Sequence, residues 1–174
     1  MRALWIVPLA TLLLGACSAP SLVNSGRAKK PYQYELDYGE SVILRNGRAY
    51  APRHAPPAVH RLVAAGNRIQ GKPYLYGGGH ARVEDRGYDC SGTVSYALIH
   101  AGALQSPMPS SGFRNYGKRG AGKWVTVYAK NGHTFLTVGG LRLDTGYRGD
   151  GRGPTWVTRP RPTKGYVMRH PPGL

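Results

Sequence analysis

Apolar residues recur at helical spacing in two stretches of the chain. The first stretch places Val59, Leu62, Val63 and Ile69 on one face, and the second places Val94, Ala97, Leu98 and Ala101 on one face. Intervals of three and four residues are typical of a helix with one buried side. Pro57 is suited to a first helical turn and Gly102 to the position after a last turn. The pattern therefore predicts one helix from about 58 to 71 and another from Cys90 or Ser91 to about 101.

The second half of the chain has the shorter apolar runs that are typical of strands. Strands are predicted over 124–129, 133–138, 141–145 and 165–169. Gly139-Gly140 joins the middle two as a tight hairpin, and Asn46-Gly47 predicts a second, smaller hairpin before the first helix. A helix followed by an antiparallel sheet indicates an α+β fold.

The N-terminal residues have the layout of an export signal. Arg2 precedes an apolar run from 3 to 14, which is too short for a membrane span of roughly 20 residues. The tetrapeptide that ends at Cys17 resembles a bacterial lipobox, which implies lipidation of Cys17. Ordinary signal cleavage, with Cys17 incidental, is the alternative. The resemblance implies a protein anchored in the cell envelope, facing the periplasm or the exterior, and in the outer membrane if the bacterium is Gram-negative.

The length of 174 residues accommodates one domain with short appendages. Residues 1–17 are assigned to the signal peptide. Residues 18–57 form a tether, rich in Ser, Ala, Lys and Pro at its start, and an N-terminal extension that includes the small hairpin. The folded domain is expected over 58–174.

The chain is strongly basic, with 24 Lys and Arg against 8 Asp and Glu and a net charge of +16. Such a charge attracts anionic partners. Nucleic acid is disfavoured because the chain carries an export signal and its basic residues are scattered among Gly and Pro, without a helical stripe or an aromatic stacking platform. Anionic wall polymers or lipid headgroups fit the compartment better, and a charge that serves only solubility remains open.

Cys90 is the single cysteine left if Cys17 is lipidated. Structural cysteines of exported proteins normally pair, so a lone thiol needs another explanation. A buried, inert cysteine is one. The other is a nucleophile, because a helix N-terminus favours the thiolate and the small residues Ser91 and Gly92 leave room for a substrate backbone. The Cys90 N–H is then suited to donate to a developing oxyanion.

His133 is the preferred general base among the six histidines. It is expected at the start of a strand, where its ring sits at the end of the sheet. Asp144 lies on the next strand, almost opposite across the Gly139-Gly140 turn, where its carboxylate is placed to orient the imidazole. His80 also remains a candidate, because it follows a glycine-rich turn just before Cys90.

Three sequence blocks together resemble the NlpC-type family of papain-like bacterial cell-wall endopeptidases. They are GKPYLYGG at 71–78, GYDCSG at 87–92 and Gly132-His133 at the head of a hairpin. The resemblance implies a papain-like α+β domain, with the nucleophile at the N-terminus of a helix packed on an antiparallel sheet. It also implies that the Tyr74 hydroxyl assists the oxyanion. The family's third catalytic member is commonly His, whereas Asp144 occupies that position here.

The function implied by the resemblance is hydrolysis of amide bonds in peptidoglycan stem peptides through a thioester on Cys90, with no cofactor. The same Cys and His would also serve an amidase, an acyltransferase or a lipid hydrolase of the envelope. A third alternative is an inactive wall-binding module. A fourth is a zinc site formed by His80, Cys90, His133 and Asp144, which lacks the usual ligand spacing.

Overall fold

The computed structural model describes residues 41–146 and 152–174. The helices are α1 (Pro57–Ile69), α2 (Cys90–Ala101) and α3 (Ser110–Phe113). The strands are β1 (Ile43–Arg45), β2 (Arg48–Tyr50), β3 (Lys118–Arg119), β4 (Val125–Lys130), β5 (His133–Val138), β6 (Leu141–Asp144), β7 (Thr155–Val157) and β8 (Val167–His170). The predicted signal peptide at 1–17, the tether and Cys17 lie outside the described residues.

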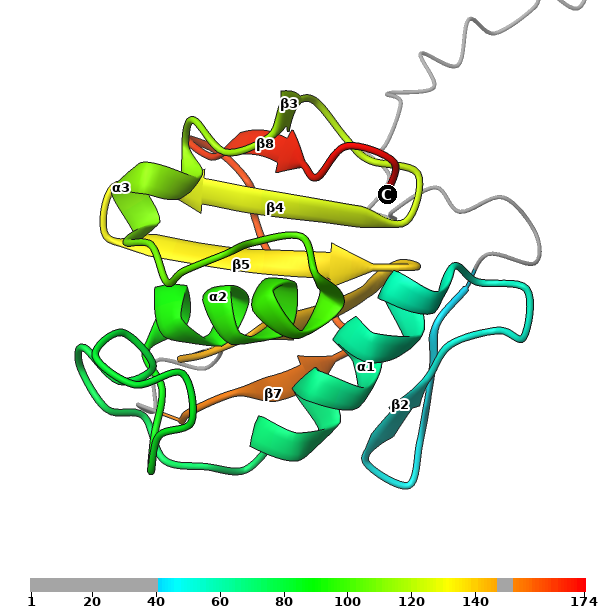
Figure 1. Ribbon diagram of the computed structural model, residues 1–174, viewed down its shortest axis with the longest axis horizontal. Coiled ribbons are helices and arrows are strands. Elements are labelled where there is room, and N and C mark those ends of the chain that lie inside the picture. The colour runs from blue at the N-terminus through cyan, green and yellow to red at the C-terminus, as the bar shows by residue number, and fades with distance from the viewer. Residues whose placement is uncertain (1–40, 147–151) are drawn as a thin grey trace, which may run out of the picture. The chain divides into compact units, whose positions relative to one another are not determined.

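Six strands form one antiparallel sheet in the order β3-β8-β4-β5-β6-β7. The helices α1 and α2 pack on each other and on one face of this sheet (Figure 1). Leu62 and Leu98 from the helices meet Val127, Leu136 and Leu143 from the sheet in a single buried cluster. The α+β arrangement predicted from the sequence, with the helix that begins at Cys90 packed on an antiparallel sheet, is therefore confirmed.

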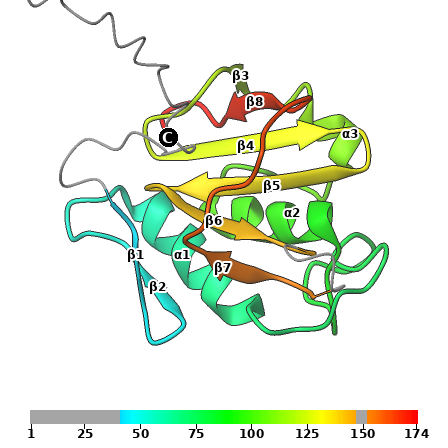
Figure 2. The same cartoon turned by 180° about the vertical axis from the view of Figure 1, so that it is seen from behind.

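The opposite face of the sheet is covered by the chain that connects β7 to β8. This segment runs across the back of β6, β5 and β4 (Figure 2). Phe135 lies beneath it with no exposed surface, and the Tyr166 ring packs edge-on against Phe135 at 5.3 Å between centroids. Side chains of neighbouring positions on β5 alternate between the two faces. His133 and Phe135 therefore share the face that this segment covers.

Both predicted helices are present and begin where the sequence predicts. Pro57 occupies the first turn of α1, where a missing backbone N–H costs nothing. The helix α2 begins at Cys90 and ends before Gly102, whose φ of 79° is a left-handed conformation that glycine adopts readily. Almost all of α2 is buried, because the helix lies between the sheet, α1 and the loop that precedes it.

The N-terminal hairpin packs on α1. Its turn at Asn46 and Gly47 has φ values of 50° and 75°, as the sequence predicts for a two-residue turn. The Asn67 side chain donates to the Ala49 carbonyl at 2.8 Å and accepts from the Ala49 N–H at 2.9 Å. Val42 and Ala49 join the buried cluster. The part of the N-terminal extension that is described here thus contributes to the core of the domain it precedes.

Three short elements have no counterpart among the predictions. They are α3, β3 and β7, of four, two and three residues. Segments this short show too little periodicity to be recognised, and long-range pairing or packing determines them. Within the described ranges, none of the helices combines the length and the apolar character needed to cross a bilayer.

Candidate active site

Asp89 caps the helix that carries Cys90. Its Oδ1 accepts from the Gly92 N–H at 2.7 Å, and its backbone carbonyl accepts from the Thr93 N–H at 2.9 Å. A capping carboxylate satisfies a backbone donor at a helix N-terminus and complements the partial positive charge there. Cys90 is the first helical residue and is 8% exposed. The cap therefore fixes the position of the thiol at the edge of the buried region.

A glycine-rich loop is held directly against this helix start. The Gly77 N–H donates to Asp89 Oδ2 at 3.0 Å, so the two carboxylate oxygens of Asp89 tie the loop to the helix. A Cβ placed on Gly92 would lie 1.9 Å from the Gly78 carbonyl oxygen. Only glycine permits this approach of two backbones. Gly92 thus serves packing within the protein, in addition to the substrate access expected from the sequence.

His133 and Asp144 lie together. The His133 Nε2 and Asp144 Oδ1 atoms are 2.9 Å apart. In the β5–β6 register Leu136 faces Leu143, which puts Asp144 on the same face as His133 and diagonal to it. The predicted position of the carboxylate, across the Gly139-Gly140 turn, follows from this register. Because Asp144 occupies Nε2, the ring nitrogen left for the thiol is Nδ1.

The imidazole interacts with both Asp144 and Cys90. Burial of the ring lowers the pKa of His133, but hydrogen bonds and charges of Asp144 and Cys90 outweigh it, so that the pKa is raised above its usual value. The α2 and β5 elements start at the same end of the domain, at the left of Figure 1. The structure therefore brings Cys90, His133 and Asp144 together, although they are far apart in the sequence.

Asp144 is fully buried and has further partners. Arg161 Nη1 donates to Asp144 Oδ2 at 2.7 Å, and the Thr145 N–H donates to Oδ1 at 2.8 Å. The buried Arg142 Nε lies 3.6 Å from Oδ2. The carboxylate thus turns one oxygen toward the histidine and the other toward the arginines. This division restricts the rotation of the carboxylate.

Tyr74 lies near Cys90. It pairs with Tyr88 in a short parallel bridge two residues before Cys90, and it is 40% exposed. The pKa of the Tyr74 hydroxyl is raised, first by partial burial and then by the negative charges of Cys90 and Asp89. The hydroxyl therefore stays protonated at neutral pH and retains a hydrogen to donate.

His80 belongs to a separate cluster at the helix start. Its Nε2 lies 3.2 Å from Asp89 Oδ1 and 3.1 Å from Ser91 Oγ. His80 contacts the cap of the helix that begins at Cys90, whereas Cys90 itself interacts with His133. Within the described parts of the chain, no group of three or more His, Cys, Asp or Glu side chains is placed to hold a metal ion, so the geometry does not support the zinc site of His80, Cys90, His133 and Asp144.

Arg161 is a site residue that sequence analysis missed. It lies in the 158–166 connection, among prolines and other arginines, where no apolar periodicity marks its position. Its guanidinium also lies over the Phe135 ring at 5.9 Å. Only the path of the chain across the back of the sheet brings it to Asp144. The Arg-Pro-Arg-Pro run at 159–162 is the one local signal, since prolines hold a segment extended.

Comparison with known proteins gives matches to solved structures alone: no family model and no curated protein matches the chain. The peptidoglycan hydrolase RipB from Mycobacterium tuberculosis is 24% identical over 67% of this chain and 68% of that chain, with a TM-score of 0.49. The P60 domain of an antigen from M. avium subspecies paratuberculosis is 21% identical over 64% of this chain and 93% of that chain, with a TM-score of 0.46. A variant of the resuscitation promoting factor interacting protein RipA is 23% identical over 75% and 70% of the two chains, with a TM-score of 0.48.

Proposed function

We propose that the protein is a cysteine peptidase that hydrolyses amide bonds in peptidoglycan stem peptides. The observation that supports this most strongly is the His133 ring, which contacts the Asp144 carboxylate through Nε2 and also interacts with the Cys90 thiol. A thiol, an imidazole and an orienting carboxylate in that order are the parts of a cysteine nucleophile with its base. The substrate class rests on the resemblance of the 71–78 and 87–92 blocks to NlpC-type endopeptidases.

In the first half of the reaction, His133 takes the Cys90 proton and the thiolate attacks the carbonyl carbon of the stem-peptide amide. The negative charge that develops on the carbonyl oxygen is stabilised by the Cys90 N–H, one of the helix N-terminal groups without an intrahelical acceptor. The Tyr74 hydroxyl is the second donor. His133 then returns its proton to the leaving amine, and a thioester on Cys90 remains.

In the second half, a water molecule replaces the amine. His133 removes a proton from this water, and the resulting hydroxide attacks the thioester carbonyl. The tetrahedral intermediate collapses, the C–S bond breaks and His133 reprotonates the thiolate. Asp144 stabilises the imidazolium in both halves, and Arg161 holds the second oxygen of Asp144. No step in this sequence uses a cofactor.

The cellular location is proposed from the N-terminal sequence. A lipid on Cys17 would anchor the protein in the cell envelope, facing the periplasm or the exterior, with the tether giving the domain reach to the wall. The net charge of +16 would hold it close to anionic wall polymers or lipid headgroups. Weaker retention on purified cell walls as salt rises is the expected behaviour.

The test is digestion of purified peptidoglycan, with the released fragments identified by mass spectrometry. Cys90→Ala and His133→Ala are each expected to lower peptide release by about 10⁴-fold or more, because either loss disables the nucleophile. His60→Ala is the matched control, since His60 is an exposed histidine on α1. Its release rate should equal that of the wild type.

A second measurement separates the substrate from the chemistry. The Cys90 thiol should react with iodoacetamide at pH 6.5 faster than a free model thiol does, and His133→Ala should slow this reaction. Rapid alkylation without wall-peptide release would support Cys90 as a nucleophile and would show that peptidoglycan peptide is not the substrate. Slow alkylation together with no peptide release would contradict the proposal that the protein is a cysteine peptidase.

A further inference from the structure

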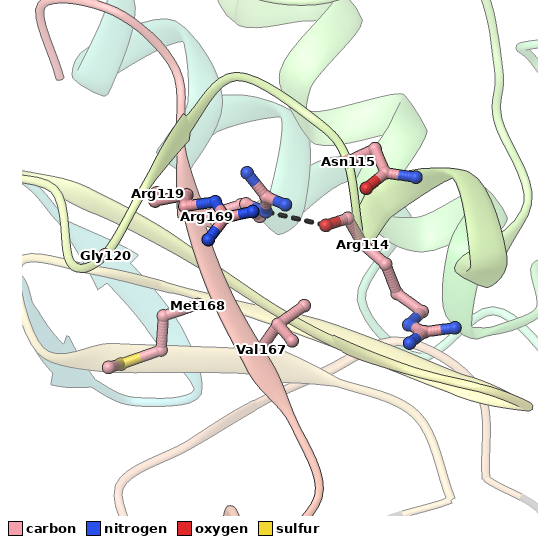
Figure 3. Close-up of a pocket in the computed structure, with 7 residues that line it drawn as sticks. All are labelled: Arg114, Asn115, Arg119, Gly120, Val167, Met168 and Arg169. Carbon is pink, nitrogen blue, oxygen red and sulfur yellow. Dashed lines mark hydrogen bonds between the residues drawn. The ribbon is translucent and has the colours of Figure 1, made fainter.

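A pocket of about 450 Å³ opens beside the short strands β3 and β8. Its lining is Arg114, Asn115, Arg119, Gly120, Val167, Met168 and Arg169 (Figure 3). Two segments far apart in sequence contribute these residues: the stretch from the end of α3 through β3 to its following turn, and β8. None of the residues assigned to catalysis above lines this pocket.

Three guanidinium groups line the pocket, and none of the described residues that line it carries a side-chain carboxylate. Arg119 and Arg169 are direct partners in the β3–β8 register. Like charges at directly opposed positions repel and destabilise a sheet. The side-chain carboxylates of the described residues are Glu84, Asp85, Asp89 and Asp144, and none of them forms an ion pair with Arg114, Arg119 or Arg169. An anion bound in the pocket would relieve this repulsion.

Two of these arginines are held in place by neutral acceptors. Arg169 Nε donates to the Arg114 carbonyl at 2.6 Å, as the dashed line in Figure 3 shows, and Arg114 Nη1 donates to Asn131 Oδ1 at 3.0 Å. A guanidinium has five N–H donors, so each of these contacts leaves several for a ligand. The hydrogen bonds orient the side chains without neutralising their charge.

The size of the pocket and the apolar part of its lining suit a ligand larger than a free ion. The pocket volume of about 450 Å³ is far above the roughly 10–15 Å³ that holds one water molecule. Val167 and Met168 are 37% and 43% exposed, and both line the pocket. An anionic group that is attached to a longer chain would place its charge on the arginines and its apolar atoms on Val167, which shares a face of β8 with Arg169.

The pocket lies close to the proposed catalytic histidine. Asn131, which accepts from Arg114, is two residues before His133, and Tyr166, which precedes Val167, contacts the His133 ring edge-on at 6.4 Å between centroids. The strands β5 and β8 are separated by β4 alone, so their spacing is about 10 Å. Three residues of extended peptide span about the same distance.

We propose that this pocket binds an anionic group, a carboxylate or a phosphate, carried by the same wall polymer whose peptide bond is cut. The charge would be bound by Arg119 and Arg169, with Arg114 at the side nearer to His133. Bound there, it would orient the polymer along β8 toward Cys90. The proposal that the pocket binds an anion does not depend on the catalytic activity, whereas the identity of the polymer rests on the proposed function.

The first experiment measures binding without turnover. Inorganic phosphate is titrated into the Cys90→Ala protein while the Nε–Hε signals of the arginines are followed by NMR. The signals of Arg119 and Arg169 should shift, and Arg119→Gln should weaken phosphate binding by about 3- to 10-fold. The control is Arg48→Gln, which removes the same charge from an exposed position in the β1–β2 hairpin and should leave binding unchanged. Equal weakening in both variants would overturn the site.

The second experiment assigns the source of the anion. With peptidoglycan, Arg119→Gln should raise KM by about 3- to 10-fold and leave kcat unchanged, because the pocket contacts only the unreactive part of the polymer. The comparison is repeated after amidation of the peptide carboxylates, and again after removal of phosphate-bearing polymers. The treatment that abolishes the difference between Arg119→Gln and the wild type identifies the ligand.

Two results would overturn the proposal. If neither treatment changes the effect of Arg119→Gln on KM, the anion does not come from the wall polymer. If Arg119→Gln reduces binding to phosphatidylglycerol vesicles while KM stays at the wild-type value, the pocket is a membrane contact.

Arg119 is exposed on a two-residue strand, so the variant tests the pocket without removing a packed side chain. A protein without peptidase activity that still binds phosphate at Arg119 would reject the proposed function and retain the site.

Discussion

The substitution Asp144→Asn tests the catalytic cluster most directly. It keeps the shape of the side chain and removes its charge. In the wild type, the carboxylate is fully buried, contacts His133 at 2.9 Å and binds Arg161 at 2.7 Å, with the buried Arg142 at 3.6 Å. The amide removes the negative charge that faces Arg161 and Arg142, and it no longer favours one tautomer of the histidine.

Two magnitudes follow from this geometry. Removing one partner of a buried ion pair costs about 3–5 kcal/mol. Domains of ordinary stability hold about 5–15 kcal/mol, so a weakened but folded variant is expected. In serine-protease triads the same change lowers kcat by about 10⁴-fold, because the histidine adopts the wrong tautomer. We expect a fall of about 10²- to 10⁴-fold in peptide release from a protein that remains folded.

The pKa of His133 provides the decisive readout. Asp144 is the strongest influence that raises this pKa, so Asp144→Asn should lower it. Because a raised histidine pKa stabilises the folded state at low pH, this contribution is complete below the ordinary histidine value of about 6.5 and is lost as pH rises through the raised folded value. The variant should therefore lose more stability at pH 6 than at pH 9.

The assay combines an NMR titration of the His133 ring, urea denaturation at the two pH values and peptidoglycan digestion. Asp85→Asn is the control, because Asp85 accepts from the backbone N–H of Gly79 and contacts no catalytic side chain. It should leave the titration of His133 unchanged. An Asp144→Asn protein that keeps a raised His133 pKa and releases peptide within about threefold of the wild-type rate would refute the assignment.

Two further predictions concern residues that position the site. Gly92→Ala should destabilise the protein by about 1–3 kcal/mol in urea denaturation, because the added Cβ would meet the Gly78 carbonyl oxygen. Gly112→Ala is the control, since a Cβ there has ordinary contacts beginning at 3.5 Å and should cost far less. Equal losses of stability in the two variants would contradict the packing argument. Arg161→Gln should lower kcat for peptidoglycan by about 10-fold and change the pH profile of the rate, since it frees one oxygen of Asp144; a rise in KM alone would instead assign Arg161 to substrate binding.

The local features of this protein were readable from its sequence. Pro57 and Gly102 marked a helix start and a helix end, and Asn46-Gly47 marked a hairpin, because each of these depends on the backbone preferences of a few neighbouring residues. The placement of Cys90 at a helix N-terminus followed from the same rules. The position of Asp144 near His133 was predictable because a two-residue hairpin turn determines which positions of its strands face each other.

Only the tertiary structure decided what surrounds these residues. Arg161 reaches Asp144 because the connection from β7 to β8 crosses the back of the sheet, and no local pattern encodes that path. Arg119 faces Arg169 because β3 pairs with β8, a two-residue contact between segments 50 positions apart. The local rules were sufficient for the helix that carries Cys90 and for the hairpin that carries His133. The buried charges behind them and the basic pocket beside them come from pairings distant in sequence, where each contact depends on the packing of the whole domain.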